Sequence, residues 1–363
     1  MRKDWEYKKL REIAFYPNDK ISVDKIESNH YVGVENLLKD KAGILFSDQL
    51  PNATTATRFK YNDILLGNIR PYLKKIWLSN IEGGASGDVI VIRSSSDNIL
   101  PNYLFKLLSS DKFFDYFNLY TKGAKMPRGD KNAIAKFIVP IPPKSTQLSI
   151  VAELDKLNEM IRLKKKQLED YDQLAQSIFY EMFGNPVENE KGWEVKKLGN
   201  VCDLKAGKAI KASELSNDNP YPCYGGNGIR GYINRCSHLE SSPIIGRQGA
   251  YCGTVNFAEA PFYATEHAVV VKSKQNMQIK WLYYTLVNLK LSKYAKGQAQ
   301  PGIAVSNLNE LVIIPLPPLP LQQQFAARIE AIEQQKQQVK DMIKDLETLL
   351  ASRMQYWFDF TPD

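Results

Sequence analysis

The chain has 363 residues, of which 44% are hydrophobic and 24% are charged, and its net charge is +8. This balance excludes a largely disordered chain, permits a polyanionic partner and, at ~100–200 residues per domain, predicts about two domains. No run approaches the ~20 apolar residues of a membrane-spanning helix and the N-terminus lacks the apolar segment of a secretory signal, so we expect a cytoplasmic protein with no membrane partner.

Short strands and helices are expected first along the chain. Apolar runs at 63–67, 89–92 and 268–271 are flanked by Gly, Asn, Ser or charged residues, which is typical of strands. Residues 101–120 and 279–295 carry aromatic and leucine side chains at helical spacing, so both stretches are predicted to be helical. Proline-rich stops then follow at 140–143 and 315–320. The predicted fold class is α+β.

The sequence repeats itself. Trp-Glu-Tyr-Lys-Lys-Leu at 5–10 returns as Trp-Glu-Val-Lys-Lys-Leu at 193–198, and Phe-Ile-Val-Pro-Ile-Pro-Pro at 137–143 returns as Val-Ile-Ile-Pro-Leu-Pro-Pro at 312–318. Looser similarity joins 87–94 to 266–273 and 122–127 to 296–301. We interpret the chain as two copies of one unit of roughly 180 residues, which differ most in the middle of each copy.

A long helix is expected after each proline-rich stop. Apolar residues recur there at alternating spacings of 3 and 4, which predicts two coiled-coil helices of about 40 residues and about 60 Å each. Two ordinary core helices are the alternative. Lys164 and Lys336 occupy positions of the apolar seam, and an antiparallel alignment places them near Ile343 and Tyr171, where they are candidates for fixing the register. The predicted seam consists of Ile150, Leu154, Leu157, Ile161, Leu168, Phe325, Ile329, Ile332, Val339 and Ile343.

Catalytic and metal-binding patterns are weak. The four cysteines lie between 202 and 252 with gaps of 21, 13 and 16 residues, which do not fit the close pairs of zinc sites, so we expect reduced structural thiols and no metal. Neither GxxxxGK[ST] nor GxGxxG occurs. Glu-x-Lys at 6–8 and 194–196 matches half of a nuclease metal site, but the pattern is common by chance and an exposed strand explains it better. We predict a protein that binds rather than catalyses, with no catalytic residue.

Cations with interleaved tyrosines and amides concentrate in the mixed part of each copy. Lysine and arginine neutralise phosphates, whereas Arg, Gln and Asn can also bind base edges, so this composition favours DNA as the partner. A solvated surface is the alternative for any single residue. The candidate DNA contacts are Arg70, Tyr72, Lys74, Lys122, Lys125, Arg128, Arg230, Arg247, Tyr251, Lys296, Gln298 and Gln300.

These motifs together resemble a known family. The Pro-x-Pro-Pro segments with the glutamines that follow them (Gln147 and Gln322), the Trp-Glu-x-Lys-Lys-Leu openings and the Gly-x-x-x-Pro loops at 123–127 and 297–301 resemble the specificity (S) subunit of type I restriction–modification enzymes, over essentially the whole chain. One departure is that Thr146 and Leu321 replace the acidic residue that usually precedes the glutamine, which leaves the start of each long helix less certain.

The resemblance implies an architecture. Two similar target recognition domains, each a twisted β-sheet with short helices, would be separated by two long antiparallel coiled-coil helices in a pseudo-twofold, circular arrangement in which the chain ends meet. The implied ranges are 1–143 for the first recognition domain, 144–184 for the first spacer helix, 185–317 for the second recognition domain and 318–360 for the second spacer helix.

The resemblance also implies a function and partners. Each recognition domain would bind one half of a bipartite site in double-stranded DNA. Two methyltransferase (M) subunits and restriction (R) subunits would join the chain and carry S-adenosylmethionine, ATP and Mg, with no cofactor in this chain. Because the middles of the copies differ, at 61–70 against 241–247, we expect an asymmetric site.

Two other functions stay open on the sequence. A structural adaptor could dock proteins through two similar domains on a coiled coil, and it would show no salt-dependent DNA binding. A nuclease could use the Glu-x-Lys pairs, and it would cleave DNA by itself in the presence of a metal ion.

Overall fold

The chain folds into two compact units that share both long helices. The computed structural model describes residues 2, 4–123, 125–297 and 301–360. Unit 1 comprises Met1–Lys164 with Met342–Asp363, and unit 2 comprises Lys165–Asp341. Within the described part of the chain, none of the helices combines the length and apolarity that crossing a membrane requires.

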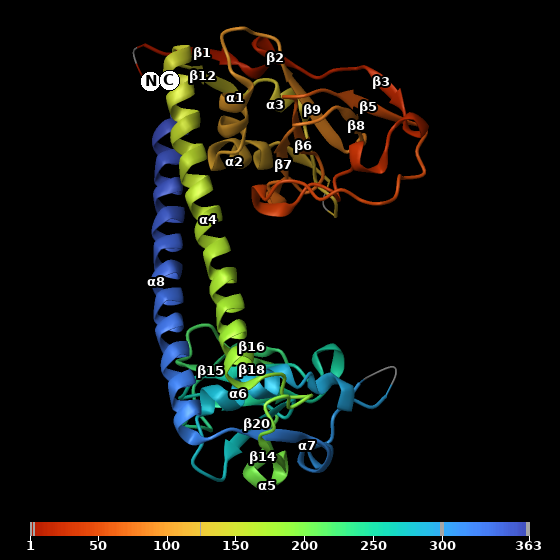
Figure 1. Ribbon diagram of the computed structural model, residues 1–363. Helices are drawn as coiled ribbons and strands as arrows, with labels where there is room; N and C mark the ends of the chain where they lie inside the picture. The colour runs from red at the N-terminus through yellow and green to blue at the C-terminus, as the bar shows by residue number, and fades with distance from the viewer. Residues whose placement is uncertain (1, 3, 124, 298–300, 361–363) are drawn as a thin grey trace. The chain divides into compact units, whose positions relative to one another are not determined.

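The same four-stranded antiparallel sheet occurs in both units (Figure 1). Each central strand has at least four consecutive buried residues, so it is covered on both faces, whereas each edge strand carries partly or fully exposed residues. In unit 1 the order is β2 (Ala14–Phe15), β9 (Val89–Ser94), β6 (Ile64–Gly67) and β7 (Ile76–Leu78). In unit 2 it is β14 (Cys202–Ala206), β20 (Ala268–Ser273), β17 (Ser242–Gly246) and β18 (Val255–Ala258). The predicted strands lie in β6, β9 and β20, and the matching order confirms the repeat.

The two most similar repeat motifs meet as one ribbon in each unit. Strand β1 (Glu6–Lys9) pairs with β12 (Ile138–Ile141), and β13 (Glu194–Lys197) pairs with β21 (Ile313–Leu316), both antiparallel. A proline occupies the same register position in both ribbons, opposite Tyr7 and Val195. Proline has no backbone N–H to donate, and a two-stranded ribbon tolerates it because one edge of each strand is unpaired.

A second, smaller sheet differs between the units. In unit 1 it has the order β3 (Lys20–Ser22), β5 (Thr55–Phe59), β8 (Gly83–Ala85) and β4 (Tyr31–Val32). In unit 2 the order is β16 (Gly228–Ile233), β15 (Tyr221–Gly225) and β19 (Tyr263–Ala264). The divergence of the copies in their middles is therefore a divergence of this sheet.

Both predicted short helices end earlier than expected. Residues 101–120 form two helices, α1 (Pro101–Leu108) and α2 (Asp111–Leu119), because the Ser110 hydroxyl accepts a hydrogen bond from the Phe113 N–H (3.2 Å) and starts a new helix. Helix α6 (Ile279–Asn288) stops where Lys290 takes a positive φ of 52°, and a separate 3-10 turn follows. The prediction of helix is therefore confirmed over most of both stretches, and it is wrong at the break between α1 and α2 and beyond the end of α6. Three short helices were not predicted: α3 (Lys131–Ile134), α5 (Leu198–Val201) and α7 (Val305–Leu311). A further two-stranded hairpin joins β10 (Thr121–Lys122) to β11 (Arg128–Gly129).

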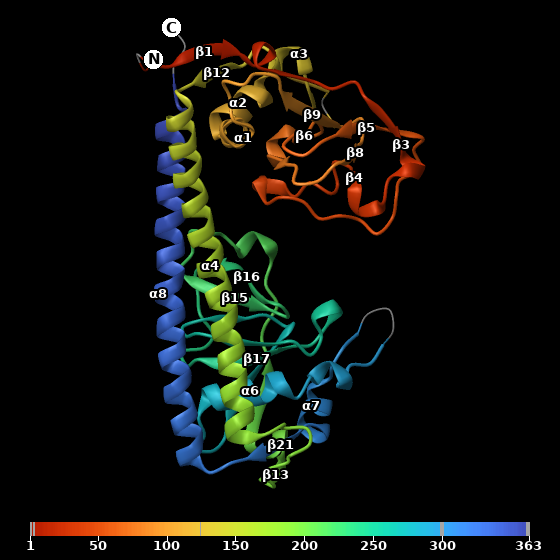
Figure 2. The ribbon, with the colours of Figure 1, turned by 45° about the horizontal axis from the view of Figure 1, so that its top comes forward.

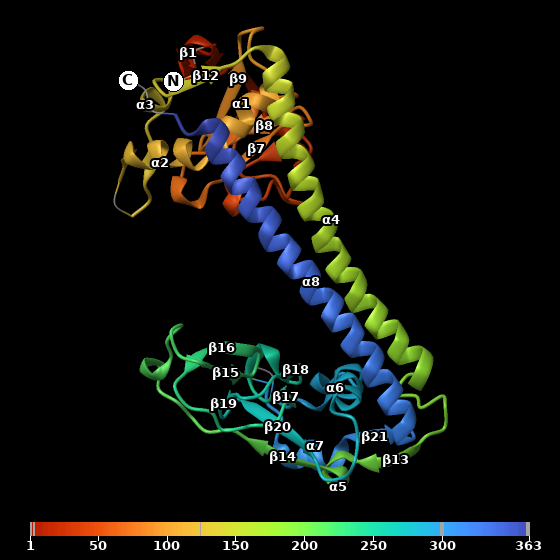
Figure 3. The same ribbon diagram turned by 90° about the vertical axis from the view of Figure 1, so that its left-hand side faces the viewer.

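The two long helices are α4 (Lys144–Phe183) and α8 (Leu319–Phe358), each of 40 residues. Their segments lie side by side and run antiparallel within each unit (Figure 3). In unit 1, Arg353 of α8 is paired with Glu153 of α4, with Nη2 and Oε2 3.0 Å apart. In unit 2, Lys336 of α8 is ion-paired with Asp172 of α4. The division of the chain into four domain ranges stays a prediction.

The predicted seam is almost entirely buried. Nine of its ten residues are buried and Leu168 is half-buried. The first residues of the seam on each helix also belong to a unit core. Ile150 and Leu154 of α4 lie in the core of unit 1, and Phe325 and Ile329 of α8 lie in that of unit 2. Lys336 contacts Asp172, the neighbour of Tyr171, close to its predicted position. The placement of Lys164 near Ile343 stays a prediction.

A buried glutamine anchors the start of each long helix. The Gln147 amide accepts a hydrogen bond from the Leu100 N–H (2.9 Å) and donates to the carbonyls of Asn98 (2.7 Å) and Pro142 (2.9 Å). The Gln322 amide accepts from the Gln278 N–H (2.9 Å) and donates to the Pro317 carbonyl (2.8 Å). Leu100 and Gln278 precede the first residues of α1 and α6. Each glutamine therefore ties the start of a long helix to the start of a short one, and the departures at positions 146 and 321 do not disturb this bonding.

The segment before β1 and the end of α8 lie side by side in unit 1 (Figure 2). Trp5 stacks on Trp357 with ring centroids 6.4 Å apart and planes 10° apart. The guanidinium of Arg2 lies over both rings, and its Nη2 donates to the Tyr356 carbonyl (2.7 Å). The predicted contact between the ends is confirmed. In unit 2 the equivalent tryptophan, Trp193, donates its indole N–H to the Phe183 carbonyl (3.0 Å).

Candidate nucleic-acid interface

Equivalent backbone contacts occur in both units just beyond the end of a central strand. After β6, the Asn68 N–H donates to the Asp88 carbonyl (2.9 Å) and the Asn68 carbonyl accepts from the Gly129 N–H (3.2 Å). After β17, the Arg247 N–H donates to the His267 carbonyl (3.1 Å) and the Arg247 carbonyl accepts from Ile303 (2.9 Å). Asn68 and Arg247 are thus structural equivalents. We call them the crossing residues. The main chain of each bonds on one side to the residue just before β9 or β20, and on the other side to a residue that follows a basic loop, Gly129 or Ile303.

A basic loop lies against each crossing residue. In unit 1 it connects β10 and β11, and in unit 2 it is closed by two hydrogen bonds between the main chains of Lys296 and Gly302 (both 2.9 Å). Gly123 and Gly297 enter these loops with nearly equal positive φ angles of 98° and 97°. A side chain would strain that conformation, which explains the glycine in each Gly-x-x-x-Pro motif.

Hydrogen bonds join each loop to the chain that follows the crossing residue. The Arg70 N–H donates to the Pro127 carbonyl (2.8 Å), and the Gly249 N–H donates to the Pro301 carbonyl (2.9 Å). Segments far apart in the sequence thereby bring predicted DNA contacts together. They are Arg70, Tyr72, Lys122, Lys125 and Arg128 in unit 1, and Arg247, Tyr251 and Lys296 in unit 2. Gln298 and Gln300 lie outside the described residues.

An exposed tyrosine stands on an equivalent turn in each unit. Tyr72 lies in the 3-10 turn Pro71–Leu73 and Tyr251 in the turn Gly249–Tyr251, with 55% and 53% of their surface exposed. The first turn is flanked by two non-glycine residues with positive φ, Arg70 (52°) and Lys74 (50°). Such backbone strain is uncommon and concentrates at functional sites. A half-exposed aromatic ring beside several cations suits contact with a nucleic acid.

Carboxylates neutralise part of the charge in unit 1. Lys74 and Lys41 both bind the Asp111 carboxylate, at 2.7 Å and 3.2 Å, and these hydrogen bonds lower the pKa of Asp111. Lys122 pairs with Asp130 (3.1 Å) and Arg128 with Asp88 (2.9 Å). Ion pairs on an exposed surface contribute little to stability, so phosphates can replace the carboxylates at little cost. Lys74 differs from the cations of the basic loop, because it shares the Asp111 carboxylate of α2 with Lys41.

Arg230 belongs to the corresponding surface of unit 2. It lies on β16, and its side chain covers Gly225, where an added Cβ would approach Arg230 Cδ to 2.5 Å. The turn between β15 and β16 lies against the two chain neighbours of the crossing residue, since a Cβ on Gly226 would lie 3.7 Å from Gly246 Cα and 3.8 Å from the Gln248 carbonyl oxygen. The structure therefore brings Arg247, Tyr251 and Lys296 together around one loop, and Arg230 lies on the hairpin whose turn packs beside Arg247.

Sequence reasoning missed Asn68. The residue is neutral and follows an apolar strand, so neither charge nor aromatic content marked it. Its signal was the alignment of Gly67-Asn68 with Gly246-Arg247, which places it opposite a residue that was predicted.

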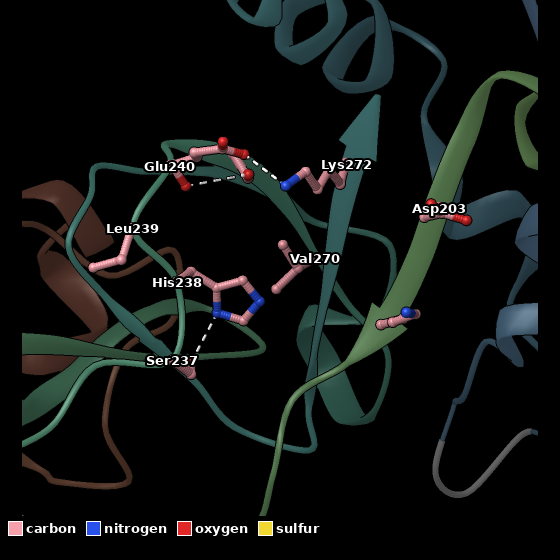
Figure 4. Close-up of a pocket in the computed structure, with 9 residues that line it drawn as sticks. Asp203, Ser237, His238, Leu239, Glu240, Val270 and Lys272 are labelled. Carbon is pink, nitrogen blue, oxygen red and sulfur yellow. Dashed lines mark hydrogen bonds and ion pairs between the residues drawn. The ribbon is translucent and has the colours of Figure 1, made fainter. Parts of the chain in front are cut away.

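A hollow of about 380 Å³ lies elsewhere in unit 2 (Figure 4). The His238 ring stacks on Phe262 (centroids 4.8 Å apart, planes 8° apart), and its Nδ1 is hydrogen-bonded to the Ser237 hydroxyl (2.8 Å). Burial, and secondarily Lys272, lowers the pKa of His238. Lys272 is paired with Glu240 (2.7 Å) at the rim. The serine oxygen also accepts the Ala264 N–H (3.2 Å), so these contacts hold the loop onto the sheet.

The cysteines and the Glu-x-Lys pairs are the other chemical groups that the sequence singled out. All four cysteines are free thiols, and no group of three or more His, Cys, Asp or Glu side chains that could hold a metal ion occurs among the residues that the structure describes. The Glu-x-Lys pairs lie on strands β1 and β13, where Lys8 is bonded to Glu6 (2.8 Å) and Lys196 to Glu194 (3.2 Å).

Known proteins resemble the chain in sequence. The family model described as type I restriction modification DNA specificity domain matches residues 2–170 and again residues 190–348. The type I restriction enzyme EcoprrI specificity subunit of Escherichia coli is 37% identical over 205 residues, which are 50% of this chain and 49% of that protein. The MjaVIII specificity subunit of Methanocaldococcus jannaschii is 24% identical over 351 residues, 80% of this chain and 78% of that protein. The match to the Escherichia coli protein thus spans about half of its length.

Two solved structures share the fold. A chain from a study of complex assembly and conformational transition of the type I R-M system has a TM-score of 0.62 at 23% identity, covering 99% of this chain and 98% of that one. The type I restriction–modification S subunit from M. genitalium has a TM-score of 0.59 at 14% identity, covering 99% and 97%. Because the family model matches most of the chain in two copies that coincide with the structural repeat, the chain belongs to the family of type I restriction–modification DNA specificity domains.

Proposed function

We propose that the chain is the sequence-recognising, non-catalytic specificity subunit of a type I restriction–modification system. Each unit binds one half of a bipartite site in double-stranded DNA. The observation that carries this proposal is the recurrence, in both units, of one surface that combines a basic loop, an exposed tyrosine and a polar crossing residue. Membership of the family supports the same conclusion.

The chemistry belongs to partners in this proposal. Two M subunits methylate adenine with S-adenosylmethionine, and R subunits use ATP and Mg to act on the DNA. The candidate contacts with DNA are those predicted from the sequence, with the basic loops and the turns of Tyr72 and Tyr251 at their centre. Lys74 is the peripheral candidate in unit 1, because its ammonium is directed to Asp111 of α2 and not to the basic loop.

The two half-sites differ in this proposal. Asn68 stands where unit 2 has Arg247, Arg70 stands where it has Gly249, and the smaller sheets have different strand orders. A symmetric DNA site requires equivalent side chains in both readers, so these differences favour an asymmetric site.

Methylome sequencing of a host that expresses the chain with its cognate M subunits tests the proposal. We expect one bipartite, asymmetric motif with methylated adenine in both halves. Exchange of residues 185–317 for those of a relative should change one half only. A palindromic motif, or no sequence-specific methylation by a folded complex, would contradict the proposal.

Salt dependence separates DNA recognition from an adaptor role. Binding of the complex to duplex DNA should weaken steeply between about 50 mM and 200 mM salt because phosphate contacts release counterions. A flat dependence would favour a protein-docking adaptor. Metal-dependent DNA cleavage by the chain alone would favour a nuclease.

A further inference from the structure

Each crossing residue has a buried side-chain polar atom without a hydrogen-bond partner among the residues that the structure describes. Buried polar atoms without a hydrogen-bond partner are rare in folded proteins. Among the described residues there are eight such side-chain atoms. Five belong to Arg247 and to residues of the segments that flank β17, and a sixth is Oδ1 of Asn68, the counterpart of Arg247. The unpaired atoms therefore cluster around Arg247 in unit 2, and the one such atom in the described part of unit 1 lies on the equivalent residue, Asn68.

In unit 2 the unpaired group is a half-buried guanidinium. No hydrogen bond or ion pair within the described residues uses the Arg247 side chain, and its Nε is covered by protein without a partner. Arg93, by contrast, donates two hydrogen bonds to Asp63 (2.8 Å and 2.7 Å). The nearby carboxylate of Glu266 is bonded to His267 (3.2 Å) instead. A half-buried cation without an acceptor requires one from a ligand or from water.

In unit 1 the same position holds a neutral amide. Asn68 is nine-tenths buried, with 9% of its surface exposed, and its carbonyl oxygen has no partner among the described residues. The neighbouring charges, Asp88 and Arg128, bond each other (2.9 Å) and leave the amide unengaged. The main chain around both crossing residues is held by the same hydrogen bonds. Only the side chain changes, as a base-reading position requires.

We propose that the crossing residues read one base each, Arg247 a guanine and Asn68 an adenine. Arginine matches the O6 and N7 acceptors of guanine in the major groove, and asparagine matches N6 and N7 of adenine, each with two hydrogen bonds. This inference rests on the proposed function, and it adds the identity of one base in each half-site. The basic loop and the exposed tyrosine beside each crossing residue hold the DNA while the base is read.

The test uses the full chain in complex with its M subunits. The motif of the wild-type complex is determined first by methylome sequencing, and the exchange of residues 185–317 assigns one half to unit 2. We expect Arg247→Gln to relax the preference for guanine at one position of that half by about 10-fold or more. Asn68→Ala should relax the preference for adenine at one position of the other half. Arg235→Gln is the matched control in unit 2, because that guanidinium is already bonded to Glu214 (2.6 Å).

A second measurement needs no variant. A duplex in which 7-deazaguanine or 7-deazaadenine replaces the proposed base lacks the N7 acceptor at that base. The control duplex carries the same analogue in the spacer between the half-sites. The wild-type complex should bind the first duplex about 10-fold more weakly than the control duplex. Unchanged binding with both analogues overturns the inference even where a variant fails to fold. So does an Arg247→Gln complex that methylates every site more slowly with the same base preferences. A wild-type complex without any bipartite motif would instead refute the proposed function.

Discussion

Two buried amides show how much one residue contributes to this fold. The sequence marked Gln147 and Gln322 as part of a repeated motif, but it could not show their role because each bonds to a loop that lies more than 40 residues away. The bonds close the gap between the start of a long helix and the start of a short helix. They also satisfy backbone groups that burial would otherwise leave unpaired.

Replacement of Gln322 by leucine should therefore destabilise the protein. The change leaves the Gln278 N–H and the Pro317 carbonyl without partners, at a cost of about 1–3 kcal/mol. Gln323→Leu, at the exposed neighbouring position, is the control and should change the free energy of unfolding by no more than ~0.5 kcal/mol. Urea denaturation of both variants measures the difference. Equal midpoints would show that the amide does not anchor the helix.

The cysteines give a second prediction at this scale. Burial raises the pKa of Cys202 to about 12 and raises the pKa values of Cys223 and Cys252, so at pH 8 these thiols stay protonated and unreactive. Cys236 is the half-buried one. The native protein should react rapidly with one equivalent of Ellman's reagent, and the protein in denaturant with four. Two or more fast thiols in the native protein would contradict this assignment.

At the scale of elements, the periodicity of apolar residues predicted whether a segment is a helix better than it predicted where the helix begins and ends. The apolar spacing across 101–120 continues through the break between α1 and α2, because both helices direct residues such as Leu104, Leu107, Phe113 and Phe117 into one core. The break depends on the Ser110 cap, which competes locally with a continuous helix. The short strands of the smaller sheets, two to six residues long, carry too little pattern to be found, and only their tertiary pairing defines them.

The pairing of α4 with α8 in unit 1 leads to a pH prediction. Arg353 and the Trp357 indole both bond the Glu153 carboxylate, and these bonds lower the pKa of Glu153. A lowered pKa stabilises the folded state above the unfolded value of about 4.3, and this contribution disappears as the pH falls through the folded value. Wild type should thus be more stable than Glu153→Gln by about 1 kcal/mol at pH 7, and the difference should shrink as the pH falls through the lowered pKa of Glu153.

Urea unfolding at pH 7 and pH 3 measures that difference. Glu159→Gln is the matched control on the same helix, because its partner Arg162 lies only three residues away and the pair does not join two helices. A stability difference for Glu153→Gln that is the same at both pH values would show that the carboxylate charge is not the cause.

At the scale of the whole molecule, the repeat predicted the architecture but not the composition of the site. Residues 68–70 and 127–129 meet only because the chain folds, so the sequence supplied the cations of the interface without their grouping. Lys74 was grouped with Arg70 by its nearness in sequence, whereas its ammonium binds Asp111 of α2. Asn68 became visible only when the second copy placed a partnerless arginine at the same position.

The last prediction concerns α4 and α8, which both connect unit 1 to unit 2. The pairs Glu153–Arg353 and Asp172–Lys336 define one antiparallel register, so deletion of residues 161–167 and 340–346 removes matched heptads and keeps both pairs. Each helix then shortens by about 10 Å at ~1.5 Å per residue, which equals ~3 bp of DNA. If the helices set the separation of the two reading surfaces, methylome sequencing should show unchanged half-sites with a spacer about 3 bp shorter.

Deletion of 161–167 alone is the control, because it breaks the register and should abolish methylation. A double deletion variant that folds, assembles and methylates the original spacer would show that the helices are not the ruler.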